Sequence, residues 1–291
     1  MGAVSKQIED LRRERGTLLM GVLNVTPDSF FDGGRYDGIS SASRRIDQLL
    51  TEGADLIDIG AESTRPGAAA IPASEQLARL EPALRYALGT GLLISVDTTD
   101  PEVARSALRL GAHLINDVSC LADPDLARAC AEHRAALIIM HARGAAASMS
   151  GFSVYPDSGY EDVVEDVRRE WQSARSRAVR AGMSAEDVYF DPGIGFAKNA
   201  QQSYALLGRL ATFQSEGLIV VGPSRKSFIA AVDGSTPEQR LGGSIAACVL
   251  AAARGAAIVR VHDVREVRQA LRVAAIVERE SPVESVAIHA G

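Results

Sequence analysis

Carboxylate, amide and cationic side chains recur at the points where the short apolar runs of this chain end. Three of them, Asp97, Asn116 and Asp191, combine hydrogen-bond acceptors with a donor. Carboxylates accept ring N–H and amino protons while an amide donates and accepts, so this set suits a flat heterocycle with an aminopyrimidinone edge. Helix or turn capping explains any one of them, and Asn116 could instead tie down Asp117. Eight polar run ends in one chain favour a binding site over capping alone.

Cationic side chains form a second set. Lys226 lies in the turn Ser224-Arg-Lys-Ser227, and Arg260 and His262 are two residues apart on one side of an apolar run. Basic residues at a helix start oppose the positive end of its dipole, and a bound carboxylate or phosphate would relieve that conflict. We expect Asn24 and His262 to reach a shared diphosphate through Mg²⁺, which rides on substrate phosphates and takes few protein ligands. Solvated loop charges are the alternative for the turn.

A polar loop follows the first apolar run, within the stretch 21–34. It carries two carboxylates, Asp28 and Asp32, with two aromatic side chains, Phe30 and Phe31, between them. Its turn-forming residues predict a loop, and a lid that excludes water from a reacting molecule explains the aromatic pair. Packing of the two rings on a neighbouring element is the alternative.

Eight apolar runs alternate with eight helical patterns along the chain. The runs are 18–24, 56–60, 92–97, 113–117, 136–141, 188–191, 218–222 and 258–262. The helical patterns are 41–52, 74–88, 101–110, 124–132, 160–181, 201–213, 241–254 and 264–280. Nearly continuous apolar character is typical of parallel strands covered on both faces. The sequence therefore predicts an α/β fold, a single (β/α)8 TIM barrel with its ligand site at the C-terminal ends of the strands.

The barrel is expected to span residues 17–280. Residues 1–16 form a charged N-terminal leader, expected to lie as a helix across the bottom of the barrel, and residues 281–291 form a C-terminal tail. Asp100 before Pro101 is a helix start signal, and Gly111 after the same segment is a stop signal.

The composition excludes several classes of protein. Of the 291 residues, 46% are hydrophobic and 23% are charged, which is ordinary for a soluble globular protein. A net charge of −6 without a basic stripe argues against a nucleic-acid partner. Residues 5–15 are mostly charged, which argues against a signal peptide, and the apolar runs are too short for a membrane span, so no membrane partner is expected. Three widely spaced cysteines, Cys120, Cys130 and Cys248, indicate a reducing compartment, and we expect a cytoplasmic protein.

Seven segments in register resemble dihydropteroate synthase. They are Asn24-Val-Thr-Pro-Asp-Ser-Phe30, Glu62-Ser-Thr-Arg-Pro-Gly67, Ser95-Val-Asp-Thr98, Ile115-Asn-Asp-Val118, Asp191-Pro-Gly-Ile-Gly-Phe196, Gly222-Pro-Ser-Arg-Lys-Ser227 and Arg260-Val-His-Asp263. The resemblance extends over about residues 17–280 and implies a transferase of folate biosynthesis. The implied reaction condenses 6-hydroxymethyl-7,8-dihydropterin diphosphate with p-aminobenzoate to 7,8-dihydropteroate and diphosphate.

The resemblance also implies a role for each matching residue. The pterin would bind to Asp97, Asn116, Asp191, Lys226 and Arg260. The diphosphate would bind to Asn24, Thr64, Arg260 and His262, with Asn24 holding Mg²⁺. The aminobenzoate would bind to Thr64, Arg65, Pro66, Phe196, Lys226 and Ser227. The catalytic set would be Phe30, Asp32, Lys226, Arg260 and His262. Diphosphate would leave first, and the neutral aryl amine would then attack the methylene carbon, so no strong general base is needed.

Some positions depart from the family pattern, and two other functions compete. Phe31 and Pro223 stand where smaller residues are usual, so an altered response to sulfonamides is expected of this sulfonamide target. A pterin-binding methyltransferase that serves a corrinoid protein would not need the 224–227 turn. A paralogue that binds pterins without turnover would not need the full polar ring. The resemblance implies a homodimer, and we expect His141 to be a core imidazole or one that supports another site residue, and not a catalyst.

Overall fold

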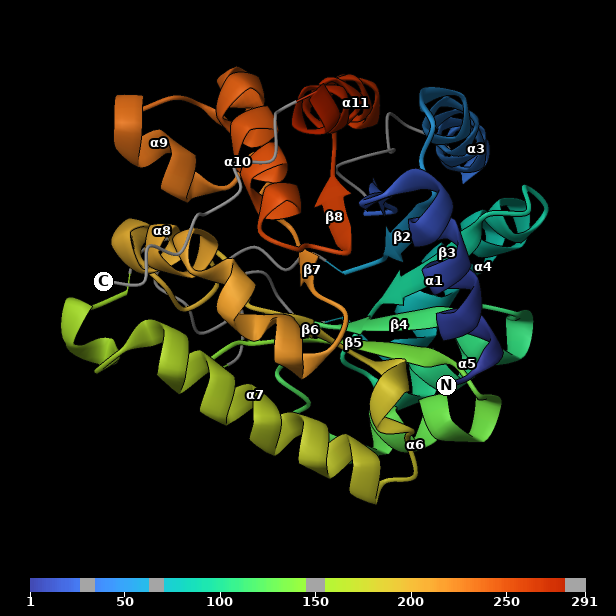
Figure 1. Ribbon diagram of the computed structural model, residues 1–291. Coiled ribbons are helices and arrows are strands. Elements are labelled where there is room, and N and C mark those ends of the chain that lie inside the picture. The colour runs from blue at the N-terminus through green and yellow to red at the C-terminus, as the bar shows by residue number, and fades with distance from the viewer. Residues whose placement is uncertain (27–34, 63–70, 145–154, 281–291) are drawn as a thin grey trace, which may run out of the picture.

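Eight parallel strands form the centre of the molecule (Figure 1). A computed structural model describes residues 1–26, 35–62, 71–144 and 155–280. The strands are β1 (Leu18–Asn24), β2 (Leu56–Gly60), β3 (Leu93–Asp97), β4 (Leu114–Asp117), β5 (Ala136–Met140), β6 (Val188–Asp191), β7 (Val220–Val221) and β8 (Ile258–Val261). Their order is β6-β5-β4-β3-β2-β1-β8-β7, and a parallel bridge between Phe190 and Ile219 brings the two edges together. The predicted (β/α)8 barrel is therefore confirmed.

Helices alternate with the strands and surround the barrel (Figure 1). They are α3 (Arg35–Glu52), α4 (Ala73–Leu88), α5 (Pro101–Leu110), α6 (Pro124–His133), α7 (Val163–Arg180), α8 (Ala200–Gly208), α9 (Ser227–Asp233), α10 (Leu241–Ala253) and α11 (Val264–Glu280). Helix α5 has the predicted end signals, because the Asp100 side chain accepts from the Glu102 amide at 2.7 Å and Gly111 adopts a left-handed φ of +114°. Every helix in the described part of the chain is too short or too polar to span a membrane.

Several elements differ from the prediction, and α3 begins at Arg35, six residues before the expected start at 41. Strand β7 has only two residues, where 218–222 was expected. The expected helix 201–213 divides after Gly208 into α8 and a 3₁₀ helix, Leu210–Glu216. Glycine is a weak helix former, which explains the break. The helix start expected at the 224–227 turn is that of α9, which is absent from the predicted helical patterns because its seven residues are too few to show a helical periodicity.

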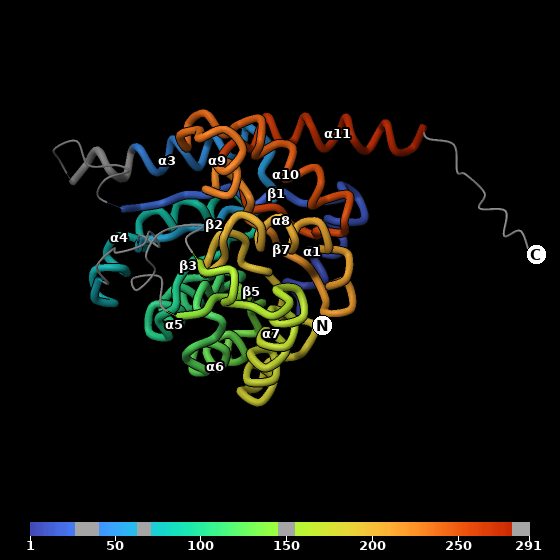
Figure 2. Tube along the Cα trace, turned by 90° about the vertical axis from the view of Figure 1, so that its left-hand side faces the viewer, coloured from blue at the N-terminus to red at the C-terminus, as the bar shows by residue number. Residues whose placement is uncertain are grey.

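Helix α1 (Ala3–Arg15) is formed by the charged leader and lies across the end of the barrel where the strands begin (Figure 2). Its Ile8 is fully buried in an apolar cluster with the inward side chains of the strands. Ser5 donates to Asp187 at 2.5 Å and accepts from the Tyr189 hydroxyl at 2.7 Å. The leader therefore closes the bottom of the barrel.

The interior of the barrel changes from apolar to polar along the strands. Near the amino ends, the inward side chains form the cluster that includes Leu18, Met20, Leu56, Leu93, Leu114, Ile138, Tyr189, Val220 and Ile258. Alternate residues of a strand share a face, so the next inward positions are Asp58 on β2, Ser95 on β3 and Asn116 on β4. A second, larger apolar cluster lies between the barrel and the helices. Polar groups are thus held at the carboxyl end of the barrel above an apolar floor.

Candidate active site

Four positions form a row across adjacent strands at the carboxyl rim. Asn24 is paired in register with Gly60, Gly60 with Asp97, and Asp97 with Asn116. A Cβ atom added to Gly60 would lie 3.4 Å from the Cβ of Asp97 and 3.6 Å from Oδ1 of Asn24. The glycine therefore lets the amide of Asn24 and the carboxylate of Asp97 approach the same small space.

Arg260 on β8 connects this row to a carboxylate inside the barrel. Its Nε donates to Oδ2 of Asp58 at 2.6 Å, and its Nη2 donates to Oδ2 of Asp97 at 3.0 Å. The amide of Asn116 donates to the same Asp58 oxygen at 3.0 Å. Burial, followed by the charge of Asp58, raises the pKa of Asp97, and Arg260 opposes that shift. One guanidinium thus joins two carboxylates through charge-assisted hydrogen bonds.

Asp58 is the site residue that the sequence analysis missed. It is fully buried on β2, and within the described residues its Oδ1 has no hydrogen-bond partner. The hydroxyl of Ser95, its register partner on β3, is likewise buried without a partner there. A lone carboxylate inside the apolar run 56–60 was the available signal, because a buried charge requires a partner elsewhere in the fold.

Asp191 and Lys226 place opposite charges at the other side of the mouth. Burial raises the pKa of Asp191, and Lys226 is the strongest opposing influence. Burial lowers the pKa of Lys226 to about 8, and Asp191 acts in the opposite sense. The Lys226 ammonium donates to the Ile194 carbonyl at 2.6 Å and lies 4.4 Å from the centre of the Phe196 ring. Oδ1 of Asp191 accepts from the Gly193 amide at 2.7 Å, which fixes the carboxylate.

The structure brings the main predicted residues to one mouth. Asp97 bonds directly to Arg260, and the charges of Asp191, Arg260 and Asp97 all act on Lys226. Ser227 follows Lys226 as the first residue of α9. Positions far apart in the chain therefore meet at the carboxyl ends of the strands, while their roles toward a ligand stay predictions.

His262 lies just beyond β8 and contacts the 224–227 turn. Its amide donates to Oγ of Ser224 at 3.2 Å, and its Nδ1 lies 3.1 Å from the same oxygen. Burial, followed by the charge of Arg260, lowers the pKa of His262 to about 4, so the imidazole is neutral near pH 7. Arg225 is engaged by Asp263, with Nε 2.9 Å from Oδ2. Lys226, rather than Arg225, is therefore the cation of this turn that can contact a ligand at the carboxyl end of the barrel.

Several predicted positions lie outside the described residues. They are Phe30, Phe31, Asp32, Thr64, Arg65, Pro66 and the tail 281–291. The expected lid and part of the expected aminobenzoate pocket therefore stay predictions. Within the ranges that the structure describes, no three His, Cys, Asp or Glu side chains gather as a metal-binding group.

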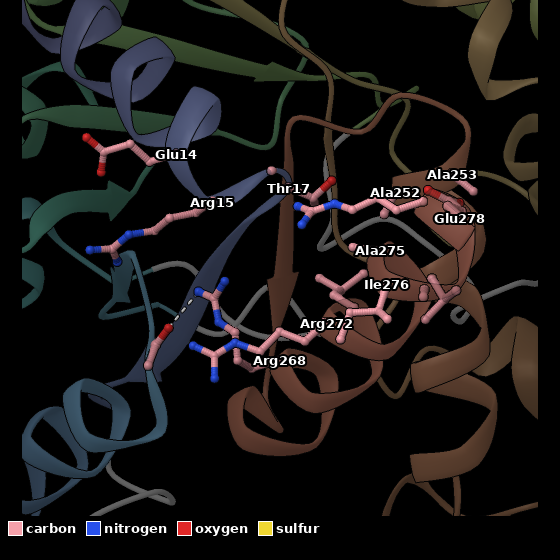
Figure 3. A pocket seen from close by; sticks show the side chains of 16 residues that line it. Glu14, Arg15, Thr17, Ala252, Ala253, Arg268, Arg272, Ala275, Ile276 and Glu278 are labelled. Carbon is pink, nitrogen blue, oxygen red and sulfur yellow. Dashed lines mark hydrogen bonds between the residues drawn. The ribbon is translucent and has the colours of Figure 1, made fainter. Parts of the chain in front are cut away.

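A cavity of about 770 Å³ lies at the opposite end of the barrel (Figure 3). Its wall includes Thr17 before β1, Gly53 before β2, and Arg268 and Arg272 of α11. Arg268 donates to the Gly53 carbonyl at 2.7 Å and pairs with the buried Asp55, so it serves the fold. Barrels of this kind carry their chemistry at the carboxyl ends of the strands, and the polar mouth is therefore the candidate active site.

Comparison with known proteins points to a single family. Residues 20–262 match the family model described as pterin binding enzyme. The chain is 42% identical over 257 residues to the dihydropteroate synthase of Escherichia coli strain K12, with 88% of this chain and 89% of that protein covered. The structure of Xanthomonas albilineans dihydropteroate synthase with 4-aminobenzoic acid matches with a TM-score of 0.82 and 40% identity, covering 90% of this chain and 93% of that one. The same enzyme in complex with 7,8-dihydropteroate gives a TM-score of 0.78 at 37% identity, covering 90% and 94%.

Replacing Asp58 with alanine tests the ion pair inside the barrel. Asp58→Ala leaves the enclosed Arg260 with Asp97 alone, so the free energy of unfolding should fall by about 3–5 kcal/mol, as for other broken buried pairs. Urea denaturation measures the change. Asp100→Ala, which removes a helix cap near the surface, is the matched control and should cost only about 1 kcal/mol. Equal losses in the two variants would show that the pair does not stabilise the barrel.

Proposed function

This chain belongs to the dihydropteroate synthases, a family of pterin-binding enzymes, and we propose that the polar mouth of its barrel is where the two substrates of that reaction meet. It is a transferase that joins 6-hydroxymethyl-7,8-dihydropterin diphosphate to p-aminobenzoate and releases diphosphate. The observation that carries the site proposal is the convergence of Asp97, Asp191, Lys226 and Arg260.

The pterin ring is held by acceptors on three strands. Asp97 and Asp191 take ring N–H and amino protons, and the carbonyl oxygen of Asn116 adds a further acceptor, because its amide nitrogen is already engaged with Asp58. All three side chains sit in a space that the barrel shields from water, where an unpaired ligand donor costs about 1–3 kcal/mol. Arg260 is fixed by Asp58 and Asp97, so its guanidinium can stack on the flat ring without reorganising.

Diphosphate departure and amine attack follow from the charges around the ring. The bond between the pterin methylene and the diphosphate oxygen breaks, and the electron pair leaves with the diphosphate. Lys226 and Arg260 stabilise the negative charge that develops on the leaving group, and the neutral His262 donates a hydrogen bond to it. Asp97 and Asp191 favour the positive charge on the pterin. The aryl amine then forms the new carbon–nitrogen bond and gives up one proton.

The aminobenzoate lies between the 191–196 turn and the start of α9. The Phe196 ring packs on the Lys226 ammonium and offers an aromatic wall, while Ser227 offers a hydroxyl and a helix-start amide. We propose that Thr64, Arg65 and Pro66 complete this pocket and that Phe30 and Asp32 cover it, on the strength of the family motif alone.

Mg²⁺ is a proposed cofactor of the diphosphate subsite, with Asn24 as its protein ligand. The residues present fit it, because Oδ1 of Asn24 is an exposed oxygen donor on the rim beside Gly60, and Mg²⁺ needs few protein ligands when phosphate oxygens supply the rest. When bound, the ion would offset the charge of the diphosphate. Asn24 itself positions that oxygen through the register of β1 with β2.

A homodimer is proposed through the outer face of α10 and α11. Apolar side chains stand out there, with Val273 56% and Val277 60% exposed. A groove of about 630 Å³ runs between the two helices and is lined by Ile245, Val249, Ala270, Val273, Ala274 and Val277, among others. Exposed apolar side chains gathered over one groove favour a protein contact. In a two-fold symmetric dimer, the apolar side chains of α10 and α11 from the second copy would pack into this groove.

A cytoplasmic location is also proposed. It is supported by the three cysteines, Cys120, Cys130 and Cys248, which are all free thiols.

Lys226→Ala tests the active site. Removal of this ammonium should lower kcat/KM by about 10³-fold or more, because the leaving group loses a preorganised cation, while the thermal unfolding profile stays close to that of the wild type. Diphosphate release is the measurement, and in the wild type it should require both substrates. Lys6→Ala, an exposed lysine on α1, is the control and should leave the rate unchanged. Wild-type kcat/KM in Lys226→Ala would refute the site assignment.

Asn24→Ala tests the magnesium site. The Mg²⁺ concentration for half-maximal rate should rise about tenfold, the order expected when one ligand or its orientation is lost. Asn199→Ala, which removes the cap of α8, should lower stability without changing the Mg²⁺ dependence. Full activity of the wild type after chelation would exclude the metal from the reaction.

Val273→Asp tests the dimer. A charge in the middle of the apolar face should convert a particle of two chains into one of a single chain in sedimentation experiments, because an unpaired buried charge is costly. Val232→Asp, at an apolar position of α9 that is 78% exposed and lies outside this groove, should not change the mass. A wild type of one chain, or a variant that stays paired, would rule out this interface.

A further inference from the structure

A fully buried lysine, Lys198, lies behind the candidate active site, outside the set of residues given a role above. Its ammonium lies 3.0 Å from Nδ1 of His141, 3.3 Å from the His141 carbonyl and 2.9 Å from the Phe196 carbonyl. Each of its three N–H groups therefore has an acceptor. Burial of an ammonium is costly unless it is fully hydrogen-bonded. These three hydrogen bonds therefore tie the segments at His141 and Phe196 to each other through Lys198.

His141 extends these contacts to the outer layer of helices. Its Nδ1 accepts from Lys198, so its Nε2 carries the proton and donates to Oε2 of Glu170 on α7 at 3.0 Å. Burial lowers the pKa of His141 to about 4, which keeps the ring neutral and agrees with the expectation of a core imidazole. Glu170 is in turn held by Arg143, with Nε 3.0 Å from Oε2. The ring therefore has one orientation.

The same contacts hold the backbone that carries the Phe196 ring. A Cβ atom at Gly193 would lie 1.9 Å from the His141 carbonyl oxygen, so the two segments touch backbone to backbone. Ala197 has a positive φ of +46°, a conformation that is unfavourable for a residue with a side chain. The Tyr160 hydroxyl donates to the Ala197 carbonyl at 2.9 Å, next to the Phe196 carbonyl that Lys198 holds. The carbonyls of Phe196 and Ala197 are thus each held by a hydrogen bond on the side of the turn that faces away from Lys226.

We propose that Lys198, acting with His141, is a positioning residue that holds the Phe196 ring against Lys226 for the aromatic amine substrate. On the front of the turn, Lys226 contacts the Ile194 carbonyl and the Phe196 ring. Lys198 holds the back of the same turn. The inference rests on the proposed role of Phe196 in binding aminobenzoate. Lys198 should affect the affinity for aminobenzoate and not the chemical step, because its side chain acts on the substrate only through the turn that carries Phe196.

Lys198→Met in the full-length chain is the test, because methionine keeps most of the volume and removes the three donated bonds. The KM for p-aminobenzoate should rise about tenfold or more, the equivalent of one or more lost hydrogen bonds. The KM for the pterin diphosphate and kcat should stay within about twofold, the pattern of lost uniform binding of one substrate. Asp55→Asn, a buried residue at the bottom of the barrel that bonds to Arg15 and the Leu19 amide, is the matched control. It should lower the melting temperature and leave both KM values unchanged.

A second variant keeps the inference testable if Lys198→Met does not fold. Tyr160→Phe removes only the hydroxyl that holds Ala197 and should raise the aminobenzoate KM about threefold to tenfold. An unchanged aminobenzoate KM in the folded variants, or an equal rise in both KM values, would overturn the positioning role. Phe196→Ala separates this outcome from a wrong substrate assignment. If Phe196→Ala also leaves the aminobenzoate KM unchanged, the proposed pocket is wrong, and if it raises that KM alone, only the role of Lys198 falls.

Discussion

The Arg260 guanidinium holds two acidic side chains of the barrel interior in one geometry, and the polar mouth is built around it. Without this cation, Asp58 and Asp97 would place two like charges in a space with little water, where their repulsion is strong. The arginine comes from β8 and the carboxylates from β2 and β3, so the contact spans β1 between them. A shift of β8 by one residue would turn Arg260 out of the barrel, and the register of the strands is therefore a condition for the chemistry.

The division of the barrel interior explains how so many polar groups can be kept in place. An apolar floor sealed by α1 fixes the lower halves of the strands, and the alternation of side chains then delivers polar groups at the upper halves. Acceptors gather on β3, β4 and β6, while the cations come from β8 and the turn after β7. A ligand with donors at one edge and a negative leaving group at the other meets fixed partners of the correct sign on each side, so little reorganisation is needed in the transition state.

The apolar runs were sufficient to predict the barrel, because parallel strands covered on both faces must be apolar almost throughout. Strand ends were equally informative: Asp97, Asn116, Asp191 and Arg260 were predicted to meet, and they do. Asp58 was missed because it lies two residues before the end of β2, among apolar neighbours, and the only signal was the energetic cost of a charge in an apolar run. Lys198 was missed for a different reason. Its partners are backbone carbonyls and a histidine from another loop, and no spacing in the sequence records such contacts. The short helix α9 lacked the length that periodicity requires.

The approach of Gly193 to the His141 carbonyl has a consequence for how such a barrel can be altered. The segments directly after β5 and β6 meet main chain to main chain at Gly193 and His141, where no side chain can be shortened to absorb a mismatch. Grafting either loop alone from a relative would set two foreign backbones against each other, whereas exchanging both keeps their fit. Changes to one of these two segments therefore require matching changes in the other, although more than fifty residues separate them along the polypeptide.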